Sequence, residues 1–208
     1  MREAAEEPPQ TRRKLLVNLG SGPKRASRLP AMFAEWREFR VDLDPGAAPD
    51  LVADITDLSA IKTGSVDAVW SAHAIEHLYL HQVKKALEEA RRILAADGFL
   101  CLIVPDLQSI AGYLVNDRLL DVVYESAAGP VTAHDMLFGY GHDLALGHTH
   151  MAHKCGFTAG VMLQKLKEVR FAEIVLRRRS NHELAAVACK RAPADTAQRE
   201  ALLTALEL

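Results

Sequence analysis

Cysteine is scarce in this chain of 208 residues, and its three cysteines, Cys101, Cys155 and Cys189, lie far apart. An odd number of widely spaced cysteines, two of them in apolar runs, does not make a disulfide framework. No stretch approaches the roughly 18 apolar residues of a membrane span, and the first residues are polar where a signal peptide needs an apolar core. We therefore expect a soluble, cytoplasmic protein that has no membrane partner.

An excess of one charge is also missing. The 25 lysines and arginines nearly balance the 27 aspartates and glutamates, so the formal net charge is only -2. A surface built mainly to hold nucleic acid or anionic lipid would be more basic. Basic residues also do not alternate with aromatic ones, as they do in an RNA-binding platform. The composition thus favours a small-molecule ligand and argues against a nucleic-acid partner.

Apolar residues make up 49% of the chain, which is sufficient for one domain with a substantial core. Short apolar runs predict strands at residues 15–17, 39–43, 51–53, 66–71, 99–104, 172–178 and 184–189. Apolar residues three and four positions apart predict helices at residues 79–95, 110–124 and 159–169. Strands that are apolar on both faces and alternate with helices indicate a doubly wound, mostly parallel α/β sheet covered on both sides.

The composition changes along the chain and suggests its organisation. Residues 1–13 are rich in charge and proline, and we expect a disordered lead-in. Residues 14–190 are the single expected domain, within which the loosely patterned segment 109–157 would form a variable lid. Residues 191–208 form a tail with helically spaced leucines, which either packs on its own domain or serves a partner or dimer. The oligomeric state is left open, with a homodimer as one option.

A glycine turn, Gly20-Ser21-Gly22, follows the first expected strand. Glycine at such a turn lets the backbone come close to a ligand, because no side chain blocks the approach. A dinucleotide site would carry a third glycine where a helix N-terminus meets the pyrophosphate, but Pro23-Lys24 stand in that place. The turn therefore indicates a nucleotide-type ligand other than a dinucleotide, while a turn without any ligand is the simpler alternative.

Carboxylates follow the next two strands. Asp42 ends the second strand, where a carboxylate can accept hydrogen bonds from both hydroxyls of a ribose. Asp54 follows the third strand, where it can accept a hydrogen bond from an exocyclic amine. Either residue alone is equally explained as a turn residue or helix cap. Because open α/β sheets bind ligands at the carboxyl ends of their strands, the glycines and the two carboxylates together indicate one ligand site.

In this order, the motifs resemble those of the class I S-adenosylmethionine-dependent methyltransferases, closest to the type 11 methyltransferase-domain group. The resemblance covers residues 14–108 strongly and 153–190 more loosely. It rests on LVNLGSGPK, VDLDP, DLVADITDL, GSVDAVWSAHAIEHL and ARRILAADGFLCLIVPDL. It implies a Rossmann-like sheet of seven strands with an antiparallel C-terminal strand. It also implies an enzyme that takes S-adenosylmethionine as its cofactor and transfers the methyl group to an acceptor.

The resemblance further implies contacts to the methionine and ribose portions of the cofactor. The backbone of Gly20, Ser21 and Gly22 would contact the methionine portion. Asn18 replaces the acid often found before the first glycine, so its contact to the ammonium would be weaker or come from a backbone carbonyl. Asp42, with Leu43 beside it, would bind the ribose, and Asp44 is a nearby alternative.

The remaining implied contacts concern the adenine and the methyl group. Asp54 would bind the adenine amine, with the backbone of Ile55 beside the ring. Ser71 would lie next to the methyl group at the end of the fourth strand, and His73 would follow it. Glu76-His77 matches the family's Glu-His pair, and we interpret this pair as structural.

The sulfonium of this cofactor is already an activated leaving group, so the protein must mainly align a nucleophile with the methyl group and exclude water. An oxygen, nitrogen or acidic carbon nucleophile must lose a proton, so a general base near neutral pH helps. His73 is the first candidate because it directly follows the fourth strand and imidazole titrates near neutrality. The alternative is that His73 only hydrogen-bonds a neighbouring loop.

Histidine is the residue in surplus, since five of the nine histidines fall between residues 134 and 153. Long loops with polar and aromatic residues often cover active sites, so we interpret this segment as a lid with one catalytic histidine, His150. The aromatic residues expected to line the pocket beneath it are Tyr113, Tyr124, Phe138 and Tyr140.

Two other interpretations of these histidines stay open. One is a solvated or internally bonded loop. The other is a metal site, whose ligands would be His148, His150 and His153 with Cys155 or Asp143. The spacing HTHMAH matches no structural zinc site, so no metal is predicted.

The acceptor is expected to be a small molecule, because about fifty residues are few for a separate substrate domain. Two other functions remain as alternatives. One is an NAD(P)-dependent oxidoreductase, against which the missing third glycine argues. The other is a non-catalytic module that binds a cofactor or a partner.

Overall fold

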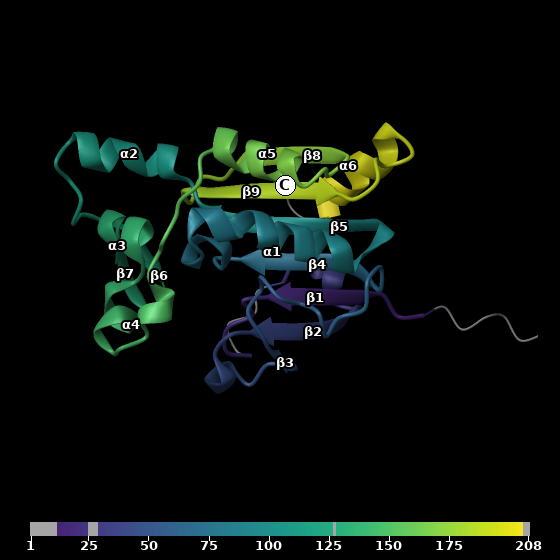
Figure 1. Ribbon diagram of the computed structural model, residues 1–208. Helices are drawn as coiled ribbons and strands as arrows, with labels where there is room; N and C mark the ends of the chain where they lie inside the picture. The colour runs from purple at the N-terminus through teal and green to yellow at the C-terminus, as the bar shows by residue number, and fades with distance from the viewer. Residues whose placement is uncertain (1–11, 25–28, 127, 206–208) are drawn as a thin grey trace, which may run out of the picture.

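A computed structural model describes residues 12–24, 29–126 and 128–205 (Figure 1). Most of the expected lead-in, residues 1–13, therefore lies outside the described residues. Its last two residues are described, and Arg12 forms an ion pair with Asp67 at 2.8 Å. Within the described ranges, no helix has the length and apolar character needed to cross a membrane.

Seven strands form one sheet in the order β3-β2-β1-β4-β5-β9-β8. The strands are β1 (Leu15–Leu19), β2 (Arg37–Asp42), β3 (Leu51–Val52), β4 (Val66–Ala72), β5 (Leu94–Pro105), β8 (Glu173–Arg178) and β9 (Glu183–Cys189). All neighbouring pairs are parallel except those made by β9, which runs antiparallel to both β5 and β8. The predicted seven-stranded, mostly parallel α/β sheet with an antiparallel C-terminal strand is confirmed.

Strand residues alternate between two core clusters, because successive side chains point to opposite faces of a sheet. In β5, Leu100 and Leu102 belong to the larger cluster, whereas Cys101 and Ile103 belong to the smaller one. The larger cluster is covered by α1 (Leu80–Ile93) and α5 (Ala159–Glu168), which lie side by side in front of the sheet (Figure 1). Both faces of the sheet are thus buried, as its uniformly apolar strands require.

The predicted helices that cover the sheet are present. On α1, the buried residues recur at helical spacing: Val83, Ala86, Leu87, Ala90 and Ile93. The N-terminus of α5 is capped by Thr158, whose hydroxyl accepts a hydrogen bond from the backbone N–H of Val161. The cap of α5 and the helical spacing of the apolar residues of α1 are local features of the sequence. For this reason the sequence predicts the bounds of both helices to within a few residues.

The C-terminal tail contains α6 (Thr196–Ala205). Leu202 and Leu203 pack against the smaller core cluster, and Arg199 forms an ion pair with Glu173 of β8 at 2.8 Å. Leu202 and Leu203 therefore pack on their own domain, whereas residues 206–208 lie outside the described residues.

Residues between β5 and α5 form a separate lobe beside the sheet (Figure 1). Its elements are α2 (Leu107–Val115), β6 (Val122–Ser126), β7 (Gly129–Thr132), α3 (Ala133–Phe138), α4 (Gly141–Ala145) and η4 (Thr149–Met151). The predicted helix over residues 110–124 is wrong beyond Val115, because Asp117 takes a left-handed conformation with φ of 56° and ends it. A two-stranded hairpin of β6 and β7 follows instead.

Candidate functional site

A cavity of about 400 Å³ lies where the first four strands of the chain end. Its walls come from the turn after β1, the end of β2 and the loops after β3 and β4. The lobe between β5 and α5 closes another side. Residues of the lobe that line the cavity are Asp143, His148, His150, Met151 and Lys154. Segments that are far apart in the sequence thus meet at one site, as the parallel topology requires.

The glycine turn packs tightly against the loop after β4. Gly20 has φ of +68°, and a Cβ atom added there would lie 2.4 Å from Cβ of Ala74. Gly22 has φ of +59°, but a Cβ atom there would meet nothing within 4 Å. Both glycines line the cavity. Gly20 is therefore required for packing as well as for backbone conformation, whereas Gly22 is required for conformation only.

Asp42 lines the cavity and also braces the turn. Its Oδ2 accepts a hydrogen bond from the N–H of Gly22 at 2.7 Å, and its Oδ1 accepts one from the N–H of Asp44 at 2.9 Å. A carboxylate can accept about four hydrogen bonds in all. Asp42 thus keeps capacity for a ligand while it holds two loops in place.

Arg40 is a buried residue of the site that the sequence interpretation missed. Its guanidinium donates hydrogen bonds to the carbonyl of Gly22, and also to those of Ala47 at 3.1 Å and Ala48 at 2.9 Å. It therefore ties the glycine turn to the loop after β2. The signal in the sequence is an arginine between the apolar residues Phe39 and Val41 of a strand, since a buried arginine seldom lacks partners.

Replacing Arg40 by methionine is expected to lower the free energy of unfolding by about 1–3 kcal/mol, because three carbonyls lose their charged donor. The ligand affinity of the cavity should fall as well, since the glycine turn loses its brace. Urea denaturation followed by circular dichroism measures the first effect. Arg37→Met is the control, because Arg37 is exposed at the start of the same strand; equal losses in the two variants would contradict the bracing role.

The strand-end residues predicted to bind a cofactor divide into two groups. Residues that line the cavity are Gly20, Gly22, Asp42, Leu43, Asp54 and Ile55. Asn18, Ser21 and Ser71 are buried and do not line it. The side-chain amide of Asn18 donates to Glu38 at 2.8 Å. A close contact of Asn18 or Ser71 with a ligand in this cavity is therefore not supported by their side-chain positions.

His73 lines the cavity, but its ring faces two carboxylates. Nε2 lies 3.1 Å from Oε1 of Glu183, and Nδ1 lies 3.4 Å from Oε1 of Glu76. Burial lowers the pKa of His73, but the hydrogen bond to Glu183 and the nearby negative charges of Glu183 and Glu76 outweigh it and raise the pKa to about 10. An imidazolium at neutral pH has no lone pair to accept a proton. The predicted role of His73 as general base therefore conflicts with the geometry, and a positioning role fits better.

The three histidines of the metal-site interpretation, His148, His150 and His153, fall into two places. The rings of His148 and His150 lie 5.9 Å apart at the cavity wall. His153 instead lies beside His77, with ring centroids 5.0 Å apart. The thiol of Cys155 contacts the carbonyl of Ile75 at 3.6 Å. The metal-site interpretation that combined His148, His150 and His153 is not supported, because the structure separates these residues.

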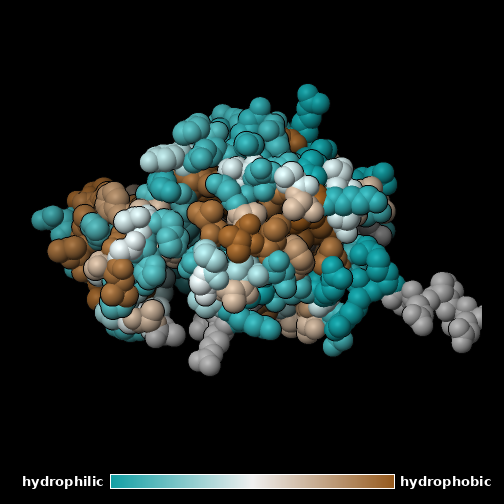
Figure 2. Space-filling model, turned by 60° about the horizontal axis from the view of Figure 1, so that its bottom comes forward, coloured by the Kyte–Doolittle hydropathy of each residue, from teal (hydrophilic) through white to brown (hydrophobic). Residues whose placement is uncertain are grey.

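The aromatic residues predicted to line the pocket do not line this cavity. Tyr113 and Tyr140 pack against the small core of the lobe, and the hydroxyl of Tyr140 donates to the carbonyl of Ala128 at 2.8 Å. Tyr124 and Phe138 are exposed, and Figure 2 shows apolar side chains on one face of the lobe. The prediction is wrong because the lobe has a hydrophobic core of its own, and Tyr113 and Tyr140 pack against that core instead of the cavity.

Comparisons with known proteins find one matching family model and solved structures with a similar fold. Residues 17–102 match a family model described as "Methyltransferase domain". A search of curated proteins finds no match. One similar solved structure is a "possible exported protein" from Bordetella parapertussis, with a TM-score of 0.55, 15% identity, and coverage of 87% of this chain and 63% of that one.

Two other solved structures carry methyltransferase names. The CMeT domain of citrinin polyketide synthase has a TM-score of 0.58 and 15% identity, over 89% of this chain and 48% of that one. The 1,6-didemethyltoxoflavin-N1-methyltransferase of Burkholderia thailandensis, solved with 1,6-didemethyltoxoflavin and S-adenosylhomocysteine, has a TM-score of 0.54 and 16% identity, over 87% of this chain and 72% of that one.

At these identities, the structural similarity establishes the fold alone. The chain also spans less than two thirds of the Bordetella and polyketide synthase chains. The family model is independent of that similarity and covers β1 to most of β5, which includes every strand end at the cavity. Residues 17–102 thus match a methyltransferase-domain model, and this match together with the fold supports a class I S-adenosylmethionine-dependent methyltransferase.

Proposed function

We propose that this enzyme transfers the methyl group of S-adenosylmethionine to a small-molecule acceptor that enters between the strand ends and the lobe. The observation that carries the proposal is that one cavity is lined both by the strand-end residues and by polar residues of the lobe. Its volume of about 400 Å³ is in the range of small-molecule sites. This arrangement does not call for the alternatives of an NAD(P)-dependent oxidoreductase or a non-catalytic module.

In this proposal the cofactor occupies the strand-end side of the cavity. The methionine portion lies along the glycine turn, where Gly22 leaves open space. The ribose hydroxyls donate to Asp42, and Leu43 lies beside them. The adenine lies by Asp54 and Ile55, which line the cavity after β3.

The acceptor then faces the lobe, where the wall carries two imidazoles, a carboxylate, an ammonium group and the thioether of Met151. Polar groups of both charges favour a small polar acceptor whose nucleophile is an oxygen, a nitrogen or an acidic carbon. The Burkholderia thailandensis methyltransferase was solved with a small heterocyclic compound and S-adenosylhomocysteine, which supports an acceptor of this size. The proposed function involves neither nucleic acid nor a membrane.

The chemistry requires one displacement step. When bound, S-adenosylmethionine would supply an activated methyl group: the acceptor would form a bond to the methyl carbon, and the sulfur would keep the electron pair of the broken carbon–sulfur bond. The acceptor's proton leaves to a base, for which His150 is the candidate on the acceptor side. His73 holds Glu76 and Glu183 together behind the cavity and thereby positions the loop after β4. Alignment and exclusion of water supply most of the rate enhancement.

Isothermal titration with S-adenosylhomocysteine tests the cofactor part. Wild-type protein should bind it, and Asp42→Asn should bind about 10- to 100-fold more weakly, because one charge-assisted hydrogen bond to the ribose is worth roughly 1.5–3 kcal/mol. Asp44→Asn should lose less, since the Asp44 carboxylate caps the short helix η2 (Pro45–Ala47) through Gly46. Absence of binding of both S-adenosylhomocysteine and S-adenosylmethionine to the wild type would refute the proposal.

A further inference from the structure

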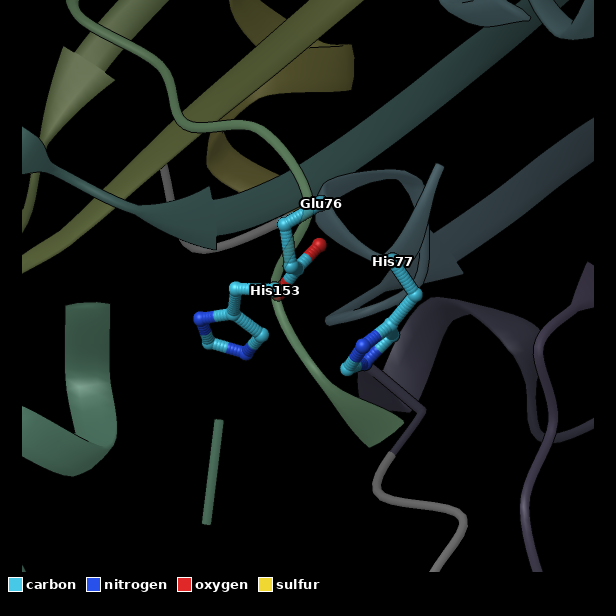
Figure 3. Close-up of side chains that lie close together, drawn as sticks. All are labelled: Glu76, His77 and His153. Atoms are coloured by element: carbon cyan, nitrogen blue, oxygen red, sulfur yellow. The ribbon is translucent and has the colours of Figure 1, made fainter. Parts of the chain in front are cut away.

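Three potential metal ligands meet where the lobe joins the sheet domain. Glu76 and His77 belong to the short helix η3 (Ile75–His77) after β4, and His153 follows η4 in the lobe. One ligand atom from each lies within 4.8 Å of the others. Figure 3 shows the three side chains converging on one small space from two segments of the chain. This trio shares only His153 with the set that the spacing of the histidines suggested.

Both imidazoles are oriented by backbone carbonyls. Nδ1 of His77 lies 3.2 Å from the carbonyl of Ala152, and Nδ1 of His153 lies 3.1 Å from that of Met136. A carbonyl only accepts hydrogen bonds, so each Nδ1 donates its hydrogen, and in a neutral ring the lone pair is then on Nε2. Histidines that bind metal ions are held in this way, with one nitrogen donating to a carbonyl or carboxylate and the other free to coordinate.

Glu76 provides an independent indication of a cation. Its side chain is 1% exposed, and among the described residues neither carboxylate oxygen makes a hydrogen bond. Its Oε1 forms an ion pair with Nδ1 of His73 at 3.4 Å. Buried carboxylates normally have hydrogen-bond partners or bind metal ions. Oε2 of Glu76 is thus a buried ligand atom without a protein partner.

We infer that Glu76, His77 and His153 bind one divalent transition-metal ion of the zinc class. Two imidazole nitrogens and one carboxylate oxygen form a ligand set that is common for such ions, and three protein ligands leave a further position for water or another small ligand. The site does not depend on how the cofactor is placed. His77 also lines the cavity, so the ion would lie beside the cavity wall.

The ion would also fasten the lobe to the sheet domain. The carbonyl of Glu76 already accepts hydrogen bonds from the N–H groups of Lys154 at 2.8 Å and Cys155 at 3.2 Å. These bonds hold the segment after His153 against η3. A metal ion bound on the side-chain side would add a second attachment at the same point, and it would fix the position of the lobe over the cavity.

The test is binding of cobalt(II) to protein stripped of metal with a chelator, followed by visible absorption and then by displacement with zinc(II). Wild-type protein should bind one equivalent of cobalt, and zinc should displace it. Glu76→Gln and His153→Gln should each weaken binding by at least about 10-fold, because each removes a ligand from the ion. Glu76→Gln is nearly isosteric, so a loss of binding with unchanged circular dichroism reports the ligand and not the fold.

A matched control comes from the other histidines of the lobe. His148→Ala/His150→Ala should leave cobalt binding unchanged, because these rings lie at the cavity wall, outside the trio. Less than one tenth of an equivalent of cobalt on wild-type protein would overturn the inference. Binding that survives in both ligand variants but disappears in the control variant would also overturn it. Titration of the same variants with S-adenosylhomocysteine separates failure of the metal site from failure of the proposed cofactor site.

Discussion

Gly20→Ala should lower the free energy of unfolding by about 2–5 kcal/mol, more than any other single substitution at the strand ends. The left-handed backbone costs a residue with a side chain about 1–2 kcal/mol. The new Cβ atom would also lie 2.4 Å from Cβ of Ala74, a clash that only a backbone shift can relieve. Overpacking of this kind costs about 1–3 kcal/mol more. Urea denaturation measures the loss, and S-adenosylhomocysteine binding should fall with it.

Gly22→Ala separates these two contributions. Gly22 has the same left-handed backbone but open space around its Cβ position, so we expect a loss of only about 1–2 kcal/mol. A double variant, Gly20→Ala with Ala74→Gly, should recover part of the stability because it removes the other carbon of the clash. Equal losses of unfolding free energy in Gly20→Ala and Gly22→Ala would show that the loop after β4 moves away from the new Cβ atom without an energetic penalty.

The sheet was predictable because its signals are local and strong. Buried strands such as β4 are apolar on both faces, and α1 repeats its apolar residues at helical spacing. The hairpin of β6 and β7 has no such signal. All residues of β6 are exposed or only half-buried, and its one apolar run, residues 122–124, directly continues the segment that was predicted as a helix. Its position depends on contacts with the small core of the lobe, which a local pattern does not report.

The site was predictable only in part, for a related reason. Parallel topology places Gly20, Asp42 and Asp54 at one edge, so their positions in the sequence already imply that they meet. The direction of a side chain and its partners are set by tertiary contacts. His73 meets Glu183, which is 110 residues away, and this pairing removes the free lone pair that a general base requires. Arg40 was missed, and Glu76-His77 was not combined with His153, because in both cases the partner residues lie on other segments of the chain.

His150→Ala is expected to lower kcat by about 100-fold or more while the affinity for S-adenosylhomocysteine changes little, because a positioned general base contributes roughly 10²–10⁴ in rate. Unlike His73, His150 lines the acceptor side of the cavity, and none of its described contacts is to a carboxylate. A panel of small hydroxyl, amine and carbon-acid acceptors, screened with methyl-labelled S-adenosylmethionine, first supplies a substrate. Steady-state kinetics on that substrate then give kcat and KM for each variant.

His148→Ala is the matched control for this prediction, because the two rings lie 5.9 Å apart on the same wall. If His150 takes the proton, His148→Ala should change KM more than kcat, since it removes a wall group without removing the base. Equal kcat for wild type and His150→Ala would mean that water accepts the proton and that the lobe serves for acceptor binding alone. A base on the acceptor side does not contact bound S-adenosylhomocysteine, so its removal should leave cofactor affinity unchanged. A loss of both kcat and cofactor affinity in His150→Ala would therefore show that His150 holds the lobe in place.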